Sequence, residues 1–431
     1  MKSNRAILAI LMLFLMALPV LVCIRKAKHS AKARAASTQT VIDFALPLKR
    51  TASTWTQKDL IISYCCSAPP SEINMDRAAS QHFNLVPAWQ ETLGFAQKHN
   101  VKVMLEHGLL TPKTIHSPEK LKQLDVVIKQ VKDNPALGAY YVLDEPLEPA
   151  FPEVAAFIEY IRKRDPKHIT FVNMLPIYGV PGKEGVDPSK TYLEFLRKYI
   201  HTAKPELLSY DYYNFFRRKD GTEYDLPVYF VNLGLVRRAA MEAQIPFMNI
   251  IQACTFTRDW RLPTEKELRW QVYTTLAYGG RGISYFLYWG PKSYGGIYQD
   301  GQETALIKPV SALNKELAIL SPILMNMDSI AVFHTAPVPA GGEALTASSP
   351  IQIVSPGEFV IGFFAKEGRR NNFMLVNRDY KNAATANLHI RACTKIKEFD
   401  RSKAEWSEVN CDESGNFKIP LEAGDGRLFC F

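Results

Sequence analysis

The chain has 431 residues, of which 47% are hydrophobic and 22% are charged. This length exceeds that of an ordinary single domain and suits a large domain of about 250 residues followed by a smaller one. The net charge of +9 is concentrated at the N-terminus, because residues 1–36 hold seven lysines and arginines and no acid, which leaves +2 for the remainder. A broad basic surface is therefore excluded, and no nucleic acid is expected as a partner.

The N-terminus has the pattern of an export signal. Lys2 and Arg5 precede an unbroken apolar run of 19 residues, Ala6 to Ile24. That length lies between a long signal-peptide core and a membrane span. Residues 1–36 are therefore predicted to be a signal peptide or a membrane anchor, the latter associating with the membrane through residues 6–24. Residues 37–54 are predicted to be a linker that leads into the first domain. Both alternatives predict an exported protein that is secreted, periplasmic or anchored with its body outside the cytoplasm.

Short apolar runs alternate with amphipathic helical patterns from about residue 60 to residue 320. The runs predict eight strands, at 60–64, 84–89, 101–105, 137–143, 168–173, 207–210, 247–251 and 282–288. The helical patterns lie at 91–99, 117–132, 152–164, 192–202, 232–243, 264–278 and 309–320. Strands that alternate with helices imply parallel strands joined by crossovers. Eight such units favour a (β/α)8 TIM barrel over 55–330, with an open doubly wound sheet as the alternative. No GxGxxG follows the first strand, which counts against a dinucleotide-binding fold.

The pattern changes after about residue 330, where helical periodicity disappears. Short strands separated by Gly, Asn and Asp turns are predicted at 351–354, 359–364, 372–377, 386–390 and 427–431. Short strands at such spacing are typical of an antiparallel arrangement. The sequence therefore predicts a small all-β sandwich over 331–431.

Acidic, amide and aromatic residues collect where the predicted barrel strands end. Active sites of TIM barrels form at the C-terminal ends of the strands, so these residues are the candidates for a site. Those expected to bind substrate are Asp144, Trp289, Tyr210, Tyr212, Trp89, Glu106, Asn173 and Gln252. Flat aromatic faces beside polar groups suit a sugar, so carbohydrate is the expected substrate and partner. Neither a metal nor an organic cofactor is implied.

Two acids stand at the ends of even-numbered strands. Glu145 follows strand four and Asp211 closes strand six. Alternate strands of a barrel contribute to the same layer, so these two carboxyl groups can share one cavity. Glycoside cleavage requires one carboxyl group to protonate the leaving oxygen and usually a second one as nucleophile or base. We therefore predict that Glu145 is the general acid/base and that Asp211 is the second carboxylate.

Several local strings resemble clan A glycoside hydrolases, such as the family 42 β-galactosidase-like proteins. Gly138–Pro146 resembles their fourth strand, in which an acid/base Glu stands before a Pro and usually after an Asn that is Asp144 here. Leu268–Tyr273 and Gly282–Trp289 resemble their last helix and strand, and Gly424–Phe429 resembles the end of their appended β-domain. The resemblance implies an enzyme that hydrolyses O-glycosidic bonds of an extracellular oligo- or polysaccharide.

The chain departs from that family at strand seven. Clan A enzymes carry their nucleophile, a Glu, at the end of this strand, whereas this chain has Gln252, an amide without nucleophilic power. One alternative is a chitinase-like arrangement, in which Glu145 is the acid and Tyr210-Asp211 assist the amide of the substrate. A second is a non-catalytic carbohydrate-binding protein on an inactive barrel. A third is a barrel enzyme of other chemistry, because fold does not determine function.

Overall fold

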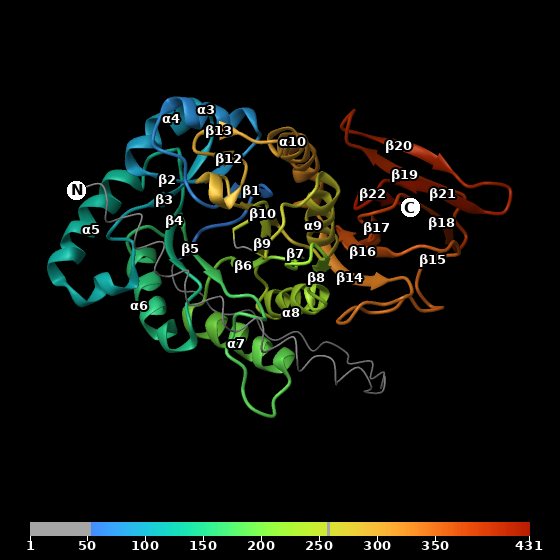
Figure 1. The fold of residues 1–431 in the computed structure, drawn as a ribbon, viewed down its shortest axis with the longest axis horizontal. Coiled ribbons are helices and arrows are strands. Elements are labelled where there is room, and N and C mark those ends of the chain that lie inside the picture. Colours follow the sequence, from blue (N-terminus) through green and yellow to red (C-terminus); the bar gives the residue numbers. More distant parts are fainter. Residues whose placement is uncertain (1–52, 257–258) are drawn as a thin grey trace.

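The structure is a computed structural model that describes residues 53–256 and 259–431. The predicted signal or anchor segment and nearly all of the predicted linker lie outside the described residues. The chain forms two bodies that lie side by side, a barrel and a β-sandwich (Figure 1). Within the described ranges, no helix is both long enough and apolar enough to cross a membrane.

The first body is a barrel of parallel strands. Its strands follow the order β1-β10-β9-β6-β5-β4-β3-β2. They are β1 (Ile61–Tyr64), β2 (Leu85–Trp89), β3 (Lys102–Glu106), β4 (Leu137–Asp144), β5 (Ile169–Met174), β6 (Leu208–Tyr212), β9 (Phe247–Gln252) and β10 (Gly282–Phe286). Asn84 joins the first strand to the second, because its backbone N–H donates to Ile62 O at 3.0 Å and its Nδ2 donates to Leu60 O at 2.8 Å. The predicted (β/α)8 barrel is thereby confirmed.

Helices surround the barrel (Figure 1). They are α3 (Glu72–Ser80), α4 (Leu93–Lys98), α5 (Pro118–Val131), α6 (Phe151–Arg162), α7 (Pro188–Ala203), α8 (Tyr229–Glu242), α9 (Glu265–Ala277) and α10 (Ile307–Leu324). Single 3-10 turns occur at Gln90–Thr92, Pro112–His116, Glu148–Ala150 and Lys292–Tyr294. Small strands in the loops are β7 (Phe215–Arg217), β8 (Glu223–Asp225), β11 (Trp289–Gly290), β12 (Tyr298–Gln299) and β13 (Gln302–Glu303). Thr264 begins α9 with the capping box expected of its sequence, in which Glu267 closes the reciprocal bond.

Side chains of the barrel strands alternate between the lumen and the helix layer, as the pleat of a strand requires. The lumen is filled by one apolar cluster, made of Ile61, Leu85, Met104, Ala139, Ile169, Phe171, Leu207, Met248 and Ile250. Cys65, Tyr141 and Phe286 pack on this cluster and are only partly buried. Cys65 and Phe286 stand at or next to the C-terminal ends of their strands, and Tyr141 lies three residues before the end of β4, so the three close the lumen toward that mouth of the barrel.

The second body is a sandwich of two antiparallel sheets. One has the order β14-β16-β17-β22-β19-β20 and the other the order β15-β18-β21. The strands are β14 (Asp328–His334), β15 (Ile351–Ile353), β16 (Phe359–Lys366), β17 (Arg369–Asn377), β18 (Ala384–Ile390), β19 (Lys395–Asp400), β20 (Glu405–Asn410), β21 (Asn416–Leu421) and β22 (Gly426–Cys430). Side chains from both sheets form one apolar cluster that includes Phe359, Phe373, Leu388 and Phe417. The predicted β-sandwich is confirmed.

Helix α9 joins the two bodies, because one side of it packs on the barrel strand β9 and another on β16, β17 and β22 (Figure 1). The approach is close enough to require glycine. A Cβ at Gly362 would overlap the carbonyl oxygen of Ala277, and a Cβ at Gly426 would lie 2.6 Å from Cδ1 of Tyr273. The tail motif Gly424–Phe429 therefore docks onto the barrel together with β16 and β17.

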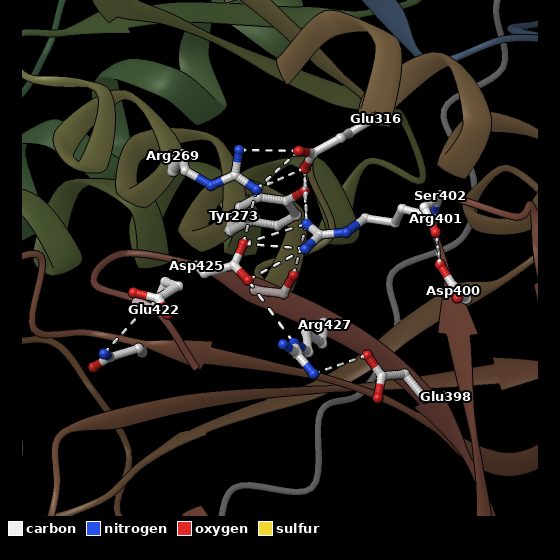
Figure 2. A network of polar contacts seen from close by, with 12 residues as sticks. Arg269, Tyr273, Glu316, Glu398, Asp400, Arg401, Ser402, Glu422, Asp425 and Arg427 are labelled. Carbon is white, nitrogen blue, oxygen red and sulfur yellow. Dashed lines mark hydrogen bonds and ion pairs between the residues drawn. The ribbon is translucent and has the colours of Figure 1, made fainter. Parts of the chain in front are cut away.

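A network of charges covers this junction (Figure 2). Asp425, only 4% exposed, accepts hydrogen bonds from Arg269 at 3.0 Å and from Arg401 at 3.2 Å. Both arginines also bind Glu316 of α10, at 2.8 Å each. The charges of the two arginines hold the pKa of Asp425 below its usual range against the effect of burial. Because these partners come from α9, α10 and the sandwich, the network couples the two bodies.

Candidate functional site

An irregularity in β4 places Asp144 at the mouth of the barrel. The pairing of β4 with β5 shifts between Tyr141 and Leu143. Tyr141 belongs to the lumen cluster, whereas Val142 and Leu143 both pack in the helix-side core. An extra residue of this kind changes which way the following side chains point. Asp144 therefore takes the lumen-facing position that strict alternation would give to Leu143.

The next residue, Glu145, leaves the strand in a constrained conformation. Its φ is +47°, in the left-handed region that a non-glycine residue occupies at some cost. Its backbone N–H still donates to Asn173 O on β5 at 2.9 Å. The turn is thus fastened to the neighbouring strand, and the partly exposed Glu145 side chain is held beside β5 and β6.

Asn173 links the acids of two strands. Its Nδ2 donates to Asp144 Oδ1 at 3.1 Å and to Asp211 Oδ1 at 2.8 Å, and its Oδ1 accepts from Ser209 Oγ at 3.0 Å. Asn173 is buried and its amide is committed to these partners. It was predicted to contact substrate; its placement is that of a residue that positions Asp144 and Asp211.

The two predicted catalytic acids come together. The carboxyl groups of Glu145 and Asp211 lie close enough to interact directly and to share a proton. Burial, and then the charges of Asp211 and Asp144, raise the pKa of Glu145 strongly. Burial and the charge of Asp144 raise the pKa of Asp211 less, because hydrogen bonds from Asn173 and Glu145 favour its ionised form. Because the pKa of Glu145 is raised more than that of Asp211, a shared proton resides on Glu145, which donates it to Asp211.

These two acids differ in access. Asp211 is 1% exposed, whereas Glu145 is partly exposed. Asp211 was predicted to stabilise or attack the reacting sugar carbon. Its burial speaks against direct attack, and its contacts make it the residue that holds the proton on Glu145.

Asp144 is open to solvent at the end of β4. It is exposed, yet the surrounding protein raises its pKa, while the hydrogen bond from Asn173 lowers it. Cys66 is exposed as well, and surrounding protein atoms together with Asp144 and Glu106 raise the pKa of its thiol to about 12. Glu106 accepts a hydrogen bond from Ser67 at 2.7 Å, and burial raises its pKa. The predicted candidates Asp144 and Glu106 therefore lie near each other around Cys66.

Half-buried aromatic side chains stand on the other side of the acids. Tyr213 lies close to Asp211 and Glu145, since burial and then these charges raise its pKa. Its ring contacts Trp260 at 4.5 Å and Phe286 at 5.2 Å between centroids. Phe286 continues the row to Phe256, at 5.5 Å. These aromatic residues were not predicted to line the site. Tyr213 could have been, because it is two positions after Asp211 and alternation puts both side chains on the same face of the sheet.

Alternation also corrects two predictions on β6. Tyr210 and Tyr212 flank Asp211 and point the opposite way, into the helix layer, where both are buried. Tyr212 packs on Tyr229 of α8 at 5.3 Å between ring centroids. They were predicted to bind substrate and instead belong to the core, because neighbouring residues of a strand face opposite sides of the sheet.

Gln252 is not available to a substrate. It is 0% exposed, and its Oε1 accepts from the backbone N–H groups of Asn214 and Phe215 at 3.1 and 2.8 Å. Its Nε2 donates to the carbonyl oxygens of Phe215 and Arg261 at 3.0 and 2.9 Å. The side chain thus ties two loops to the end of β9. This placement contradicts the predicted hydroxyl contact and leaves the strand-seven position without a reactive group.

The two predicted aromatic platforms, Trp289 and Trp89, have different surroundings. β10 ends at Phe286, earlier than predicted, so Trp289 falls in β11 and stacks on Tyr298 at 5.4 Å between centroids. Its structural role is to cover that loop. Trp89, at the end of β2, lines a recess of about 640 Å³ together with His107. Among the described residues, no group of three or more His, Cys, Asp or Glu side chains could hold a metal ion.

No protein-family model and no curated protein matches the sequence. Solved glycoside hydrolases nevertheless share the architecture. A catalytic mutant of Gan42B, a GH42 β-galactosidase from G. stearothermophilus, is 8% identical with a TM-score of 0.55 over 86% of this chain and 98% of its own. A family 5 glycoside hydrolase from Bacteroides vulgatus is 9% identical with a TM-score of 0.53, over 86% and 88%. The chain has a glycoside hydrolase fold.

A family 39 glycoside hydrolase from Bacteroides cellulosilyticus is also similar, at 10% identity and a TM-score of 0.51, over 86% of this chain and 81% of its own. The three structures belong to three different glycoside hydrolase families. The likeness therefore concerns the fold, and it does not single out family 42.

Proposed function

We propose that the protein is a glycoside hydrolase that cleaves O-glycosidic bonds of an oligo- or polysaccharide outside the cytoplasm, with Glu145 as the general acid. The observation that carries this proposal is the partly exposed carboxyl group of Glu145 at the mouth of a barrel, beside the buried Asp211 and next to Asp144, surroundings that raise its pKa. A general acid must hold its proton at the working pH, and an ordinary glutamic acid has lost it there.

Each neighbour has a part in the proposed chemistry. Glu145 gives its proton to the oxygen of the leaving group as the glycosidic bond breaks. Asp211 stabilises the protonated form before this step. Asp144, which is exposed, is the carboxylate that can meet the positive charge that develops on the sugar ring. Tyr213 and Trp260 supply aromatic surface against which the apolar face of a sugar can pack.

The proposal is tested with aryl glycosides of common sugars. The full chain and the variant Glu145→Gln are compared, with Glu303→Gln as control because Glu303 is an exposed acid of β13. We expect Glu145→Gln to lower kcat by about 100-fold or more for substrates with poor leaving groups, the usual range for loss of a general acid. The control should keep the activity. Equal activity of Glu145→Gln and the unaltered chain would remove Glu145 from the mechanism.

A second function is favoured by one observation. The strand-seven position holds Gln252, whose amide is committed to backbone groups, so the barrel has no protein nucleophile there. A carbohydrate-binding protein on an inactive barrel would have this feature. It would bind an oligosaccharide in calorimetry with the same affinity in the unaltered chain and in Glu145→Gln, and neither would release product.

A further inference from the structure

We propose that the substrate is a 2-acetamido sugar whose own amide oxygen replaces the missing protein nucleophile, and that Asp144 is the carboxylate that orients this amide. The inference rests on the proposed glycosidase function and names its substrate class. Three features support it. The strand-seven position holds the buried Gln252, the carboxyl groups of Glu145 and Asp211 interact directly, and Asp144 is exposed.

The first feature is the loss of a nucleophile. A retaining enzyme with a covalent intermediate requires a carboxylate across the sugar from the general acid. Gln252 cannot serve, since it is uncharged, 0% exposed and bonded to the backbone at both ends of its amide. Replacement of this residue by a carboxylate would also set a negative charge against the carbonyl oxygens of Phe215 and Arg261. Gln252 therefore has a structural role at the end of β9.

The second feature is how close the carboxyl groups of Glu145 and Asp211 lie to each other. Retaining enzymes keep their carboxyl groups about 5 Å apart and inverting enzymes more than about 6.5 Å apart, so that a sugar carbon or a water fits between them. The carboxyl groups of Glu145 and Asp211 interact directly with each other, which leaves no room for a sugar carbon or a water between them. Asp211 is also 1% exposed. It therefore positions the proton on Glu145 and does not attack the substrate.

The third feature is that Asp144 is the exposed acid of the group. Asn173 donates to its Oδ1 at 3.1 Å, which holds the carboxylate in place while the side chain remains open to solvent. Because Asp144 and Glu145 are adjacent at the end of β4 and both influence Asp211, both can contact the same bound sugar. An acetamido group at C2 is next to the reacting carbon C1, so its N–H can reach the acid beside the proton donor.

The chemistry balances without a further reagent. The acetamido oxygen forms a bond to C1 while the bond from C1 to the leaving oxygen breaks, and that oxygen takes the proton of Glu145. Asp144 accepts a hydrogen bond from the amide N–H, and its negative charge stabilises the positively charged bicyclic oxazolinium ion that results. Water then adds to C1, the ring reopens to the acetamido group, and the water's proton returns to Glu145. The sum is hydrolysis with retention at C1.

The test uses matched aryl β-glycosides that differ only at C2, in both the gluco and the galacto configuration. Each pair has one 2-acetamido substrate and one 2-hydroxy substrate. We expect the acetamido member of one pair to be hydrolysed with kcat/KM at least about 100-fold above its partner, because the internal nucleophile is present in only one of them. The first product, followed by NMR, should keep the β configuration.

A binding measurement distinguishes a loss of amide orientation by Asp144 from a loss of folding. The N-acetylglucosamine and N-acetylgalactosamine thiazolines imitate the bicyclic intermediate, and one of them should raise the Tm of the full chain. The variant Asp144→Asn should lose this shift and about 100-fold of kcat, while its own Tm stays near that of the unaltered chain because Asn173 can still bond to an amide oxygen. Glu303→Gln serves as the control that keeps both readouts.

The outcomes distinguish this inference from the proposed function. Efficient hydrolysis of the 2-hydroxy substrates, or an inverted product, would overturn the inference and leave the glycosidase function standing. Inversion would direct attention to Glu106 as a base acting on water, since Glu106 and Asp144 both lie close to Cys66. No hydrolysis of any pair and no thiazoline binding would overturn both.

Discussion

Replacement of Asp211 by asparagine tests whether a buried carboxylate keeps Glu145 protonated. The variant removes a charge but retains a side chain of the same shape that can still bond to Asn173 and Glu145. Burial of Glu145 is unchanged, so the variant isolates the electrostatic part of the raised pKa. Asp144 remains as the second negative neighbour.

The size of the effect follows from the contact between the two carboxyl groups. Two unit charges about 4 Å apart interact by about 4 kcal/mol at an effective dielectric constant of about 20. One pKa unit corresponds to about 1.4 kcal/mol, so the charge of Asp211 can raise the pKa of Glu145 by at most about 3 units. Because Glu145 is partly exposed, we expect its pKa to fall by about 1–3 units in Asp211→Asn.

The assay measures kcat/KM as a function of pH, with an aryl glycoside that the unaltered chain hydrolyses. A general acid is active while protonated, so activity is lost as the pH rises through its pKa. Removal of a neighbouring negative charge lowers that pKa, and the alkaline limb of the profile should move to lower pH by the same 1–3 units. Glu303→Gln should leave the limb in place. An unchanged alkaline limb in a folded Asp211→Asn variant would refute the proposed role of Asp211.

Three further predictions concern Gln252, the junction between the two bodies, and Tyr213. Gln252→Glu should lower the Tm without any gain of activity, because a carboxylate cannot donate to the two carbonyl oxygens that Gln252 now binds; higher activity at the original Tm would contradict this. Arg401→Met should destabilise the junction by about 2–3 kcal/mol, seen as a lower Tm in calorimetry, since it removes charged hydrogen bonds from Glu316 and a buried acid. Lys403→Met, at an exposed side chain of the same loop, should have no such effect. Tyr213→Ala should raise KM about tenfold through lost aromatic contact, whereas Tyr210→Phe should not change it, because that ring faces the helices.

The order of strands and helices could be predicted because it depends on local periodicity. Runs of apolar residues separated by amphipathic helices predict parallel strands wherever they occur, and eight of them close a barrel. The candidate acids could be predicted for the same reason, since Glu145 and Asp211 stand where strands end. The sandwich was predictable from its turn residues and short strands.

The errors concern the direction of single side chains. Tyr210 and Tyr212 could have been excluded from the chain alone, because residues adjacent to an inward-facing Asp211 must face outward. Trp289 was misplaced because β10 ends earlier than its apolar run suggests. The position of Asp144 depends on the irregular pairing of β4 with β5, which is a property of two strands together.

The chain's own pattern of residues thus decides the architecture and the rim at which chemistry can occur, because periodicity is a short-range property that each segment carries by itself. Only the folded molecule decides which of those rim residues act. It places Glu145 against Asp211, buries Gln252 among loop backbone groups and brings Trp260 to Tyr213 across 46 intervening positions. These are contacts between segments that are distant along the chain, and their burial and charge set the pKa values on which the proposed reaction depends.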